Sequence, residues 1–328
     1  MPEPSEIIRK ATLLARKDWQ VYTAAQDREI YSIFSVAADE IERKVQKMVR
    51  RGKVPPSRLY GLHRAITDEM TAIRPRLAGK IKAGMSGSVD YGLKSGIISM
   101  DKALGSTARK VQLGSSFIGK DGKVRRYNPV KELYADSRWA KINGAAMDSL
   151  LRFKPSGITL SKRVWDITWQ TEKTLRHELA SSVLIGESPA ALSRTIRGRL
   201  LMPETLRGVA KQEYHPGTGI YKSAYKNAMR VTRTEYATAY SEGTRRYAQE
   251  KTWIKGYISR TTSGNPAEYD ASIDGVYFPK NSEPSPPYHP SCMCYLELVY
   301  DEIVPEKDEW ADADQLQGPE HWNKITSA

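Results

Sequence analysis

Residues 230–243 read RVTRTEYATAYSEG, and this stretch decides how the chain folds. Its apolar and small residues recur at spacings of three and four, which indicates an α-helix with one buried face. We expect that helix to run from about Tyr221 to Lys251. Its buried stripe is expected to comprise Met229, Thr232, Tyr236, Ala239, Tyr240, Gly243 and Tyr247.

Two charged residues border this stripe. At about 100° per residue, Arg233 lies about 60° to one side of Tyr236, and Glu235 lies about 100° to the other. Long polar side chains in such positions can reach polar groups of a packed neighbour, so an internal polar network is predicted. An ordinary pair of solvated charges at the border of a helix is the alternative.

The segment 1–112 is predicted to form an N-terminal helical region. The first helix should run from about Ser5 to Arg51, and Ser57 can cap a second helix that ends at Arg74-Pro75, because a proline disfavours the helical conformation of the residue before it. Four glycines in the next apolar segment permit the close approach of another helix. They are Gly84, Gly87, Gly92 and Gly96.

The segment 113–130 changes character. Two short β-capable runs flank Asp121-Gly122, which is typical of a β-hairpin. The same residues superficially match a phosphate-binding loop, but Asp121 stands where that loop needs Ser or Thr. The basic residues of the hairpin could contact DNA or a partner protein, and a plain surface loop is the alternative. These residues are Lys120, Lys123, Arg125 and Arg126.

The segment 131–220 reads as a central helical region. A helix should begin at Leu160, with Thr159 or Ser161 as its cap, and continue to about Leu184 before Gly186. Ser188 should cap a shorter helix that begins at Pro189, where the missing N–H of proline is tolerated. The long helix opened by residues 230–243 follows.

Residues 221–300 combine that helix with β-structure. Residues 253–260 read as a strand, Asp274-Gly275 as a turn that enters a second strand, and residues 294–300 as a third. The predicted fold class is therefore mainly α, with long N-terminal and central helices followed by a small α+β C-terminal domain that holds a short antiparallel sheet. One face of this sheet should pack on the tyrosine-rich helix.

The last 28 residues, 301–328, form an acidic tail. Eight acidic and two basic residues give this tail a net charge of −6. Because the whole chain has a formal net charge of +13, the first 300 residues carry +19. Such an excess favours polyanionic neighbours, although many solvated helical proteins are as basic. No run of about 18 apolar residues occurs, so no membrane partner is expected. Because the start shows no secretory signal pattern, we expect the chain to be intracellular when it is made.

Both cysteines of the chain fall in residues 286–294, which read PPYHPSCMC. A disulfide between Cys292 and Cys294 would be strained, so reduced thiols are expected. The segment is a candidate site or a local structural latch. Cys292 beside His289 lacks an identifiable third group to orient the base, which argues against nucleophilic catalysis.

Three spaced motifs resemble the phage Mu protein F-like head morphogenesis family over about residues 225–300. The motif residues are Arg233 and Glu235 on the helix, Asp274 and Gly275 in the turn, and His289, Pro290, Cys292 and Cys294 before the last strand. The resemblance implies a non-enzymatic minor head protein of a tailed phage or prophage. It further implies binding to the portal protein and to other capsid or scaffold proteins, inside the virion near the portal and, during assembly, in the host cytoplasm. Contact with phage DNA would accompany head assembly and DNA packaging or delivery.

This chain departs from the family pattern at two positions. Met293 stands where arginine is common, and Asp270 stands where histidine or cysteine is common. A metal cluster of the family type would therefore use Asp270, His289, Cys292 and Cys294, and zinc accepts these ligand types. On one extended strand the two cysteines would lie roughly 7 Å apart, too far for one ion unless the backbone turns.

The favoured alternative to zinc is a latch without a cofactor. In this latch His289 forms a hydrogen bond to Glu235, or to groups linked to Arg233, and the cysteines pack inside. The alternative function is a DNA-binding or metal-dependent DNA-processing protein. Its metal would be held by Asp270, Asp274, Glu235 and His289.

Overall fold

The computed structural model describes most of the chain before residue 301. The described residues are 4–49, 52–108, 116–118, 124–126, 137–152, 158–201, 223–249, 251, 254–261, 267–282, 286–289 and 292–300. The acidic tail lies outside them. The predicted fold class is confirmed: long helices dominate, and a small antiparallel sheet lies near the C-terminal end.

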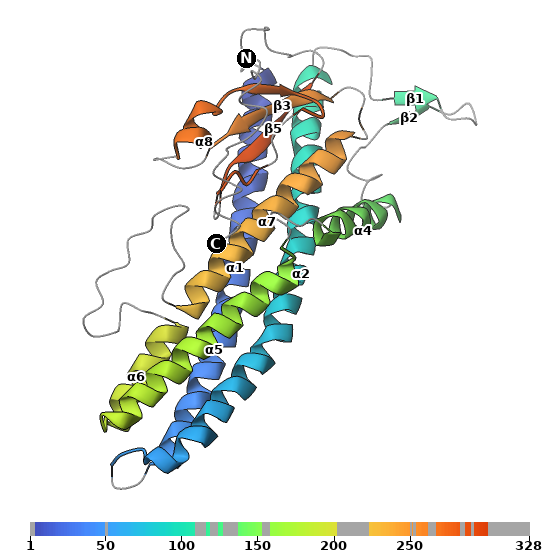
Figure 1. Ribbon diagram of the computed structural model, residues 1–328. Helices are drawn as coiled ribbons and strands as arrows, with labels where there is room; N and C mark the ends of the chain where they lie inside the picture. The colour runs from blue at the N-terminus through green and yellow to red at the C-terminus, as the bar shows by residue number, and fades with distance from the viewer. Residues whose placement is uncertain are drawn as a thin grey trace.

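Two long helices, α1 (Pro4–Lys47) and α2 (Leu59–Ala108), run side by side along the length of the molecule (Figure 1). Gly52, with a φ of +76°, and the short 3₁₀ helix η1 (Pro56–Arg58) lie between them. The positive φ explains a glycine at this position, because other residues adopt that conformation at a cost.

The prediction that the second helix ends at Arg74-Pro75 is wrong, because α2 continues through Pro75. Proline inside a helix costs about 3 kcal/mol. The apolar stripe of α2 is unbroken on both sides of it, and each buried aliphatic side chain contributes roughly 1.5–3 kcal/mol. The free energy gained by burying the stripe therefore exceeds the proline penalty, and the helix continues. The stripe around Pro75 consists of the buried residues Met70, Ile73, Leu77 and Ile81.

The helix α7 (Ala224–Gln249) crosses the α1–α2 pair, and its predicted stripe is buried. It approaches α2 so closely that a Cβ atom added to Gly92 would lie 2.0 Å from the carbonyl oxygen of Tyr240. A Cβ atom added to Gly243 would lie 2.3 Å from the carbonyl oxygen of Val89. Gly84 and Gly96 make room for the rings of Tyr236 and Tyr247 in the same way. The predicted role of the α2 glycines in close helix packing is confirmed.

Three further helices complete the helical part: α4 (Ser137–Arg152), α5 (Leu160–Leu184) and α6 (Pro189–Leu200). The caps predicted for α5 and α6 are confirmed, whereas Ser57, predicted to cap the second helix, lies inside η1 and makes no cap hydrogen bond. Thr159 Oγ1 accepts a hydrogen bond from Lys162 N at 3.2 Å, and Ser188 Oγ accepts one from Ala191 N at 3.2 Å. Contacts join α5 to α2, and α6 to α1.

The C-terminal sheet contains β3 (Ile254–Arg260), β4 (Tyr277–Pro279) and β5 (Tyr295–Tyr300) in the order β4-β3-β5. Both pairings are antiparallel, and the short helix α8 (Glu268–Ser272) precedes β4. Contacts of β5 with α7 and α1 fasten the sheet to the helices. The prediction that the sheet packs on α7 is thus confirmed.

The predicted hairpin is present as β1 (Ser116–Ile118) and β2 (Val124–Arg126), with Phe117 opposite Arg125. Arg125 and Arg126 belong to β2. Lys120 and Lys123 lie outside the described residues, as does Pro290.

One large hydrophobic core takes residues from α1 through to β5, so the predicted segments 1–112, 131–220 and 221–300 all contribute to it. A second, small core lies beneath the C-terminal sheet and consists of Ile273, Phe278, Tyr288, Cys292 and Cys294. None of the described helices combines the length and the apolar content that a membrane-spanning segment needs.

Candidate functional site

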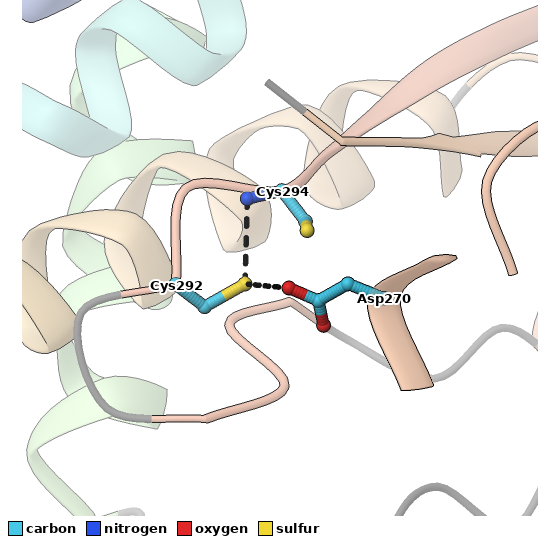
Figure 2. Close-up of side chains that lie close together, drawn as sticks. All are labelled: Asp270, Cys292 and Cys294. Carbon is cyan, nitrogen blue, oxygen red and sulfur yellow. Dashed lines mark hydrogen bonds between the residues drawn. The ribbon is translucent and has the colours of Figure 1, made fainter. Parts of the chain in front are cut away.

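The backbone turns sharply at the two cysteines, immediately before β5. Cys292 N donates a hydrogen bond to the carbonyl oxygen of His289 at 3.0 Å, and Cys294 N donates one to Cys292 Sγ at 3.4 Å (Figure 2). The spacing expected for an extended strand therefore does not apply to this pair. The turn brings the two sulfur atoms within 4.8 Å of each other.

Asp270 of α8 meets this turn from the other side of the small core. Its Oδ2 atom lies 2.8 Å from His289 Nε2 and accepts a 3.7 Å hydrogen bond from Cys292 Sγ. The candidate ligand atoms of Asp270, Cys292 and Cys294 all lie within 4.8 Å of one another. The fold thus brings together three of the four residues that the sequence indicates as a metal cluster, and it places the fourth, His289, against Asp270.

The two thiols are electrostatically unequal. A hydrogen bond from Cys294 lowers the pKa of Cys292, against the opposing effect of burial, and His289 lowers it further. The same hydrogen bond raises the pKa of Cys294, and burial raises it again. Cys292 is therefore the first of the pair to become a thiolate, and thiolate is the form that binds metals.

The donor set and its spacing fit zinc. Ligand atoms around one tetrahedral zinc ion lie roughly 3–4 Å apart, given metal–ligand bonds of about 2.0–2.3 Å. Asp270 Oδ1 is buried and has no hydrogen-bond partner among the described residues, so the carboxylate keeps an unused acceptor atom. Two sulfur atoms, one carboxylate oxygen and an imidazole nitrogen would hold the ion. When bound, zinc would supply a cross-link between α8 and the turn.

Arg16 of α1 packs against the same turn, and the sequence analysis missed it. Its Nη2 atom donates a hydrogen bond to the carbonyl oxygen of Met293, between the two cysteines, at 2.6 Å. Its guanidinium carbon lies 4.1 Å from the centre of the Trp19 ring and 4.8 Å from that of Tyr240. The available signal was a cation at a position of α1 that continues the buried stripe of Ile8 and Thr12.

The latch expected between His289 and Glu235 is wrong, because Glu235 has a different partner. Its carboxylate pairs with Arg163 of α5. Burial raises the pKa of Glu235, and Arg163 opposes that rise. Arg233 points to the other shoulder of α7, where its Nη2 atom lies 3.0 Å from Asp27 Oδ2 of α1. The two charges that flank the stripe therefore join α7 to two different helices. Glu235 is buried, as the predicted internal network requires, whereas Arg233 is exposed, as in the alternative of a solvated border charge.

The Asp274-Gly275 turn has a structural role. Asp274 Oδ1 accepts a hydrogen bond from Thr261 N at 2.8 Å. Gly275 has a φ of +86° and donates its N–H to the carbonyl oxygen of Ser259 at 2.8 Å. The turn therefore closes the connection from β3 to β4.

The four acidic and histidine residues considered for a nuclease do not form one cluster. Within the part of the chain that the structure describes, the one group of three or more potential metal ligands is Asp270, Cys292 and Cys294. Glu235 and Asp274 are engaged with Arg163 and Thr261 instead.

A second notable surface lies on the outer side of α5. The rings of Trp165 and Trp169 stack with their centres 5.6 Å apart, and the two residues are 39% and 38% exposed. Lys162 Nζ lies 4.6 Å from the Trp165 ring centre, and Lys173 Nζ lies 5.6 Å from that of Trp169. We call this pair and its two lysines the tryptophan surface.

Comparisons with models of protein families, with curated proteins and with solved structures each find no match.

Proposed function

We propose that this chain is a minor head protein of a tailed phage or prophage, which binds the portal and inner capsid and supports head assembly and DNA packaging or delivery. The observation that carries the proposal is that α7, which holds the first motif, packs against β5, the strand that follows the cysteine turn. The α7 motif fastens α7 to α1 and α5. The Asp274-Gly275 turn and the cysteine turn form the sheet unit that packs on α7.

The geometry of the cysteine turn favours a structural role over catalysis. Asp270, Cys292 and Cys294 are 4%, 1% and 2% exposed, so a substrate would have no access to them. Catalytic metal sites keep an open position, whereas structural sites are closed. This closed cluster supports a non-enzymatic protein that acts by binding other molecules.

The charge of the chain suits the interior of a capsid. The excess of positive charge in the first 300 residues attracts polyanions such as packaged DNA, with a strength that salt reduces. We place the protein inside the virion near the portal, and in the host cytoplasm during assembly.

The decisive experiment is co-expression with the portal protein of the same genome. The extract is treated with nuclease, so that DNA cannot bridge the two proteins, and the complex is purified through a tag on the portal. We expect co-elution at a fixed stoichiometry that survives high salt. A capsid reconstruction would then show this chain beside the portal. Failure to co-elute, with the isolated chain folded by circular dichroism, would contradict the proposal.

The tryptophan surface favours a second candidate function, DNA binding. Exposed aromatic rings flanked by cations are typical of surfaces that stack the bases of single strands, at about 1–3 kcal/mol per base. The double variant Trp165→Ala and Trp169→Ala should then weaken binding to a single-stranded oligonucleotide at least about tenfold. Tyr60→Ala is the matched control, because Tyr60 is an exposed aromatic residue of another helix.

The same preparation distinguishes the two candidates. Strong affinity for DNA without portal, lost in the tryptophan variant and retained in the control, would favour the second candidate. DNA cleavage that requires an added divalent metal would point to its DNA-processing form. Portal binding by a chain that shows no measurable affinity for DNA would leave the head protein as the single function.

A further inference from the structure

Arg16 is buried to an unusual degree for a cation. It is 2% exposed, and among the described residues no carboxylate lies within ion-pairing distance of it. Its Nε and Nη1 atoms have no hydrogen-bond partner there either. A buried charge of this kind costs several kcal/mol unless an anion compensates for it. The surrounding aromatic rings offset only part of that cost.

The groups beside Arg16 that can become anions are the two thiols. Its guanidinium donates a hydrogen bond to the carbonyl oxygen of Met293, the residue that separates Cys292 from Cys294. The cation is therefore placed where charge on the sulfur atoms would stabilise it.

We propose that Arg16 is the buried counter-charge of the Zn²⁺ site that Asp270, His289, Cys292 and Cys294 would form. Binding releases the two thiol protons to solvent and requires a neutral imidazole with its proton on Nδ1. The ion brings two positive charges, the thiolates and the carboxylate bring three negative ones, and Arg16 restores neutrality. A neutral cluster is what a buried, apolar environment favours.

The choice of zinc follows from the ligands. Thiolates select soft or borderline ions, and a set of two sulfur atoms, one nitrogen and one oxygen suits the tetrahedral geometry of zinc. His289 already lies 2.8 Å from Asp270, so it reaches the fourth position by exchanging that hydrogen bond for a bond to the metal. The site would cross-link α8 to the cysteine turn, and Arg16 would connect the cluster to α1.

The first test measures metal on the isolated full-length chain. The protein is purified with excess zinc and dialysed, and its metal content is determined by elemental mass spectrometry. We expect one zinc per chain. Replacement by cobalt should give the intense sulfur-to-cobalt charge-transfer absorption of a thiolate site. A folded protein with neither zinc nor this absorption would overturn the proposal.

Ligand variants test the donor set. Asp270→Asn and the double variant Cys292→Ser and Cys294→Ser should each abolish stoichiometric zinc, and the double variant should abolish the cobalt absorption. Asp274→Asn is the matched control, because Asp274 lies in the neighbouring turn and outside the cluster. Full zinc binding by the cysteine variant would refute these ligands.

Arg16 variants test the counter-charge separately. Arg16→Met should lower zinc affinity about 10- to 100-fold, the usual effect of losing a residue that supports metal ligands. Arg16→Lys keeps the charge and should recover most of the affinity. In the metal-free protein, Arg16→Met should leave the melting temperature unchanged or raise it, because it removes an uncompensated buried cation. Unchanged zinc affinity in Arg16→Met would overturn this role. None of these measurements involves the portal, so their failure is separable from failure of the proposed function.

Discussion

The interface between α2 and α7 and the small core beneath the C-terminal sheet are stabilised by different means. At the first, glycines let two long helices approach to backbone contact, and tyrosine rings fill the remaining space. At the second, Ile273, Phe278 and Tyr288 pack with the two thiols, beside a carboxylate and an imidazole. A long apolar interface is stable without help, whereas a core this small gains from polar or metal cross-links. Three substitutions test that contrast.

The largest effect is expected at the helix interface. Gly92→Val would place a Cβ atom 2.0 Å from the carbonyl oxygen of Tyr240, so α7 would have to move away. We expect the free energy of unfolding in urea to fall by about 3 kcal/mol, the upper part of the range for overpacking. Gly79→Ala is the control in the same helix, because a Cβ atom there meets nothing within 4 Å. Equal losses in both variants would mean that helix packing does not depend on this contact.

An intermediate and local effect is expected in the sheet unit. Arg260 Nε lies 2.8 Å from Glu297 Oε2, and Glu297 is buried. Arg260→Met would leave that carboxylate without its cation, at about 2 kcal/mol. Hydrogen exchange should become faster in β3 and β5 while α1 and α2 keep their protection, because the Arg260–Glu297 pair joins the two strands to each other. Lys255→Met, at an exposed position of the same strand, should change little. Uniformly faster exchange across the helices would show that the regions unfold together.

The smallest effect is expected at the ion pair between Arg163 and Glu235, and it depends on pH. Burial raises the pKa of Glu235 above its ordinary value of 4.5. A carboxyl group that holds its proton more tightly in the folded than in the unfolded state makes stability fall as pH rises from about 4.5 through the raised pKa. Glu235→Gln removes this titration.

Chemical denaturation at a series of pH values checks the expectation. The difference in unfolding free energy between the wild type and Glu235→Gln should shift in favour of the variant as pH increases through this window. A difference that stays constant with pH would mean that Glu235 titrates alike in both states. A shift in favour of the wild type would mean that Arg163 outweighs burial.

Local sequence patterns predicted most of the fold. The caps at Thr159 and Ser188, the stripe of α7 and the strands of the sheet each depend on neighbours within a few residues. The ending predicted at Pro75 was wrong because the penalty of proline is local, whereas the burial that outweighs it comes from packing against other helices.

The candidate site was predictable in its composition and not in its contacts. The residue types of Asp270, His289, Cys292 and Cys294 indicated a cluster, and the turn that unites them could not be read from spacing alone. Arg16 was missed because it lies in a different helix at the far end of the chain. The partner of Glu235 was missed because it lies on another helix, and only the packing shows that α5 reaches this side of α7.

The contact of Arg16 with Met293 joins residues that are 277 positions apart. At roughly 5–20 residues per second, a ribosome needs about 15 to 55 s to synthesise the chain between them. For that interval Arg16 of α1 lacks its backbone acceptor, because Met293 has not yet been synthesised. The helices can therefore pair before the sheet forms. The N-terminal part of α1 reaches its native contacts only after the C-terminal sheet has been synthesised, and during that delay chaperones can bind the nascent chain.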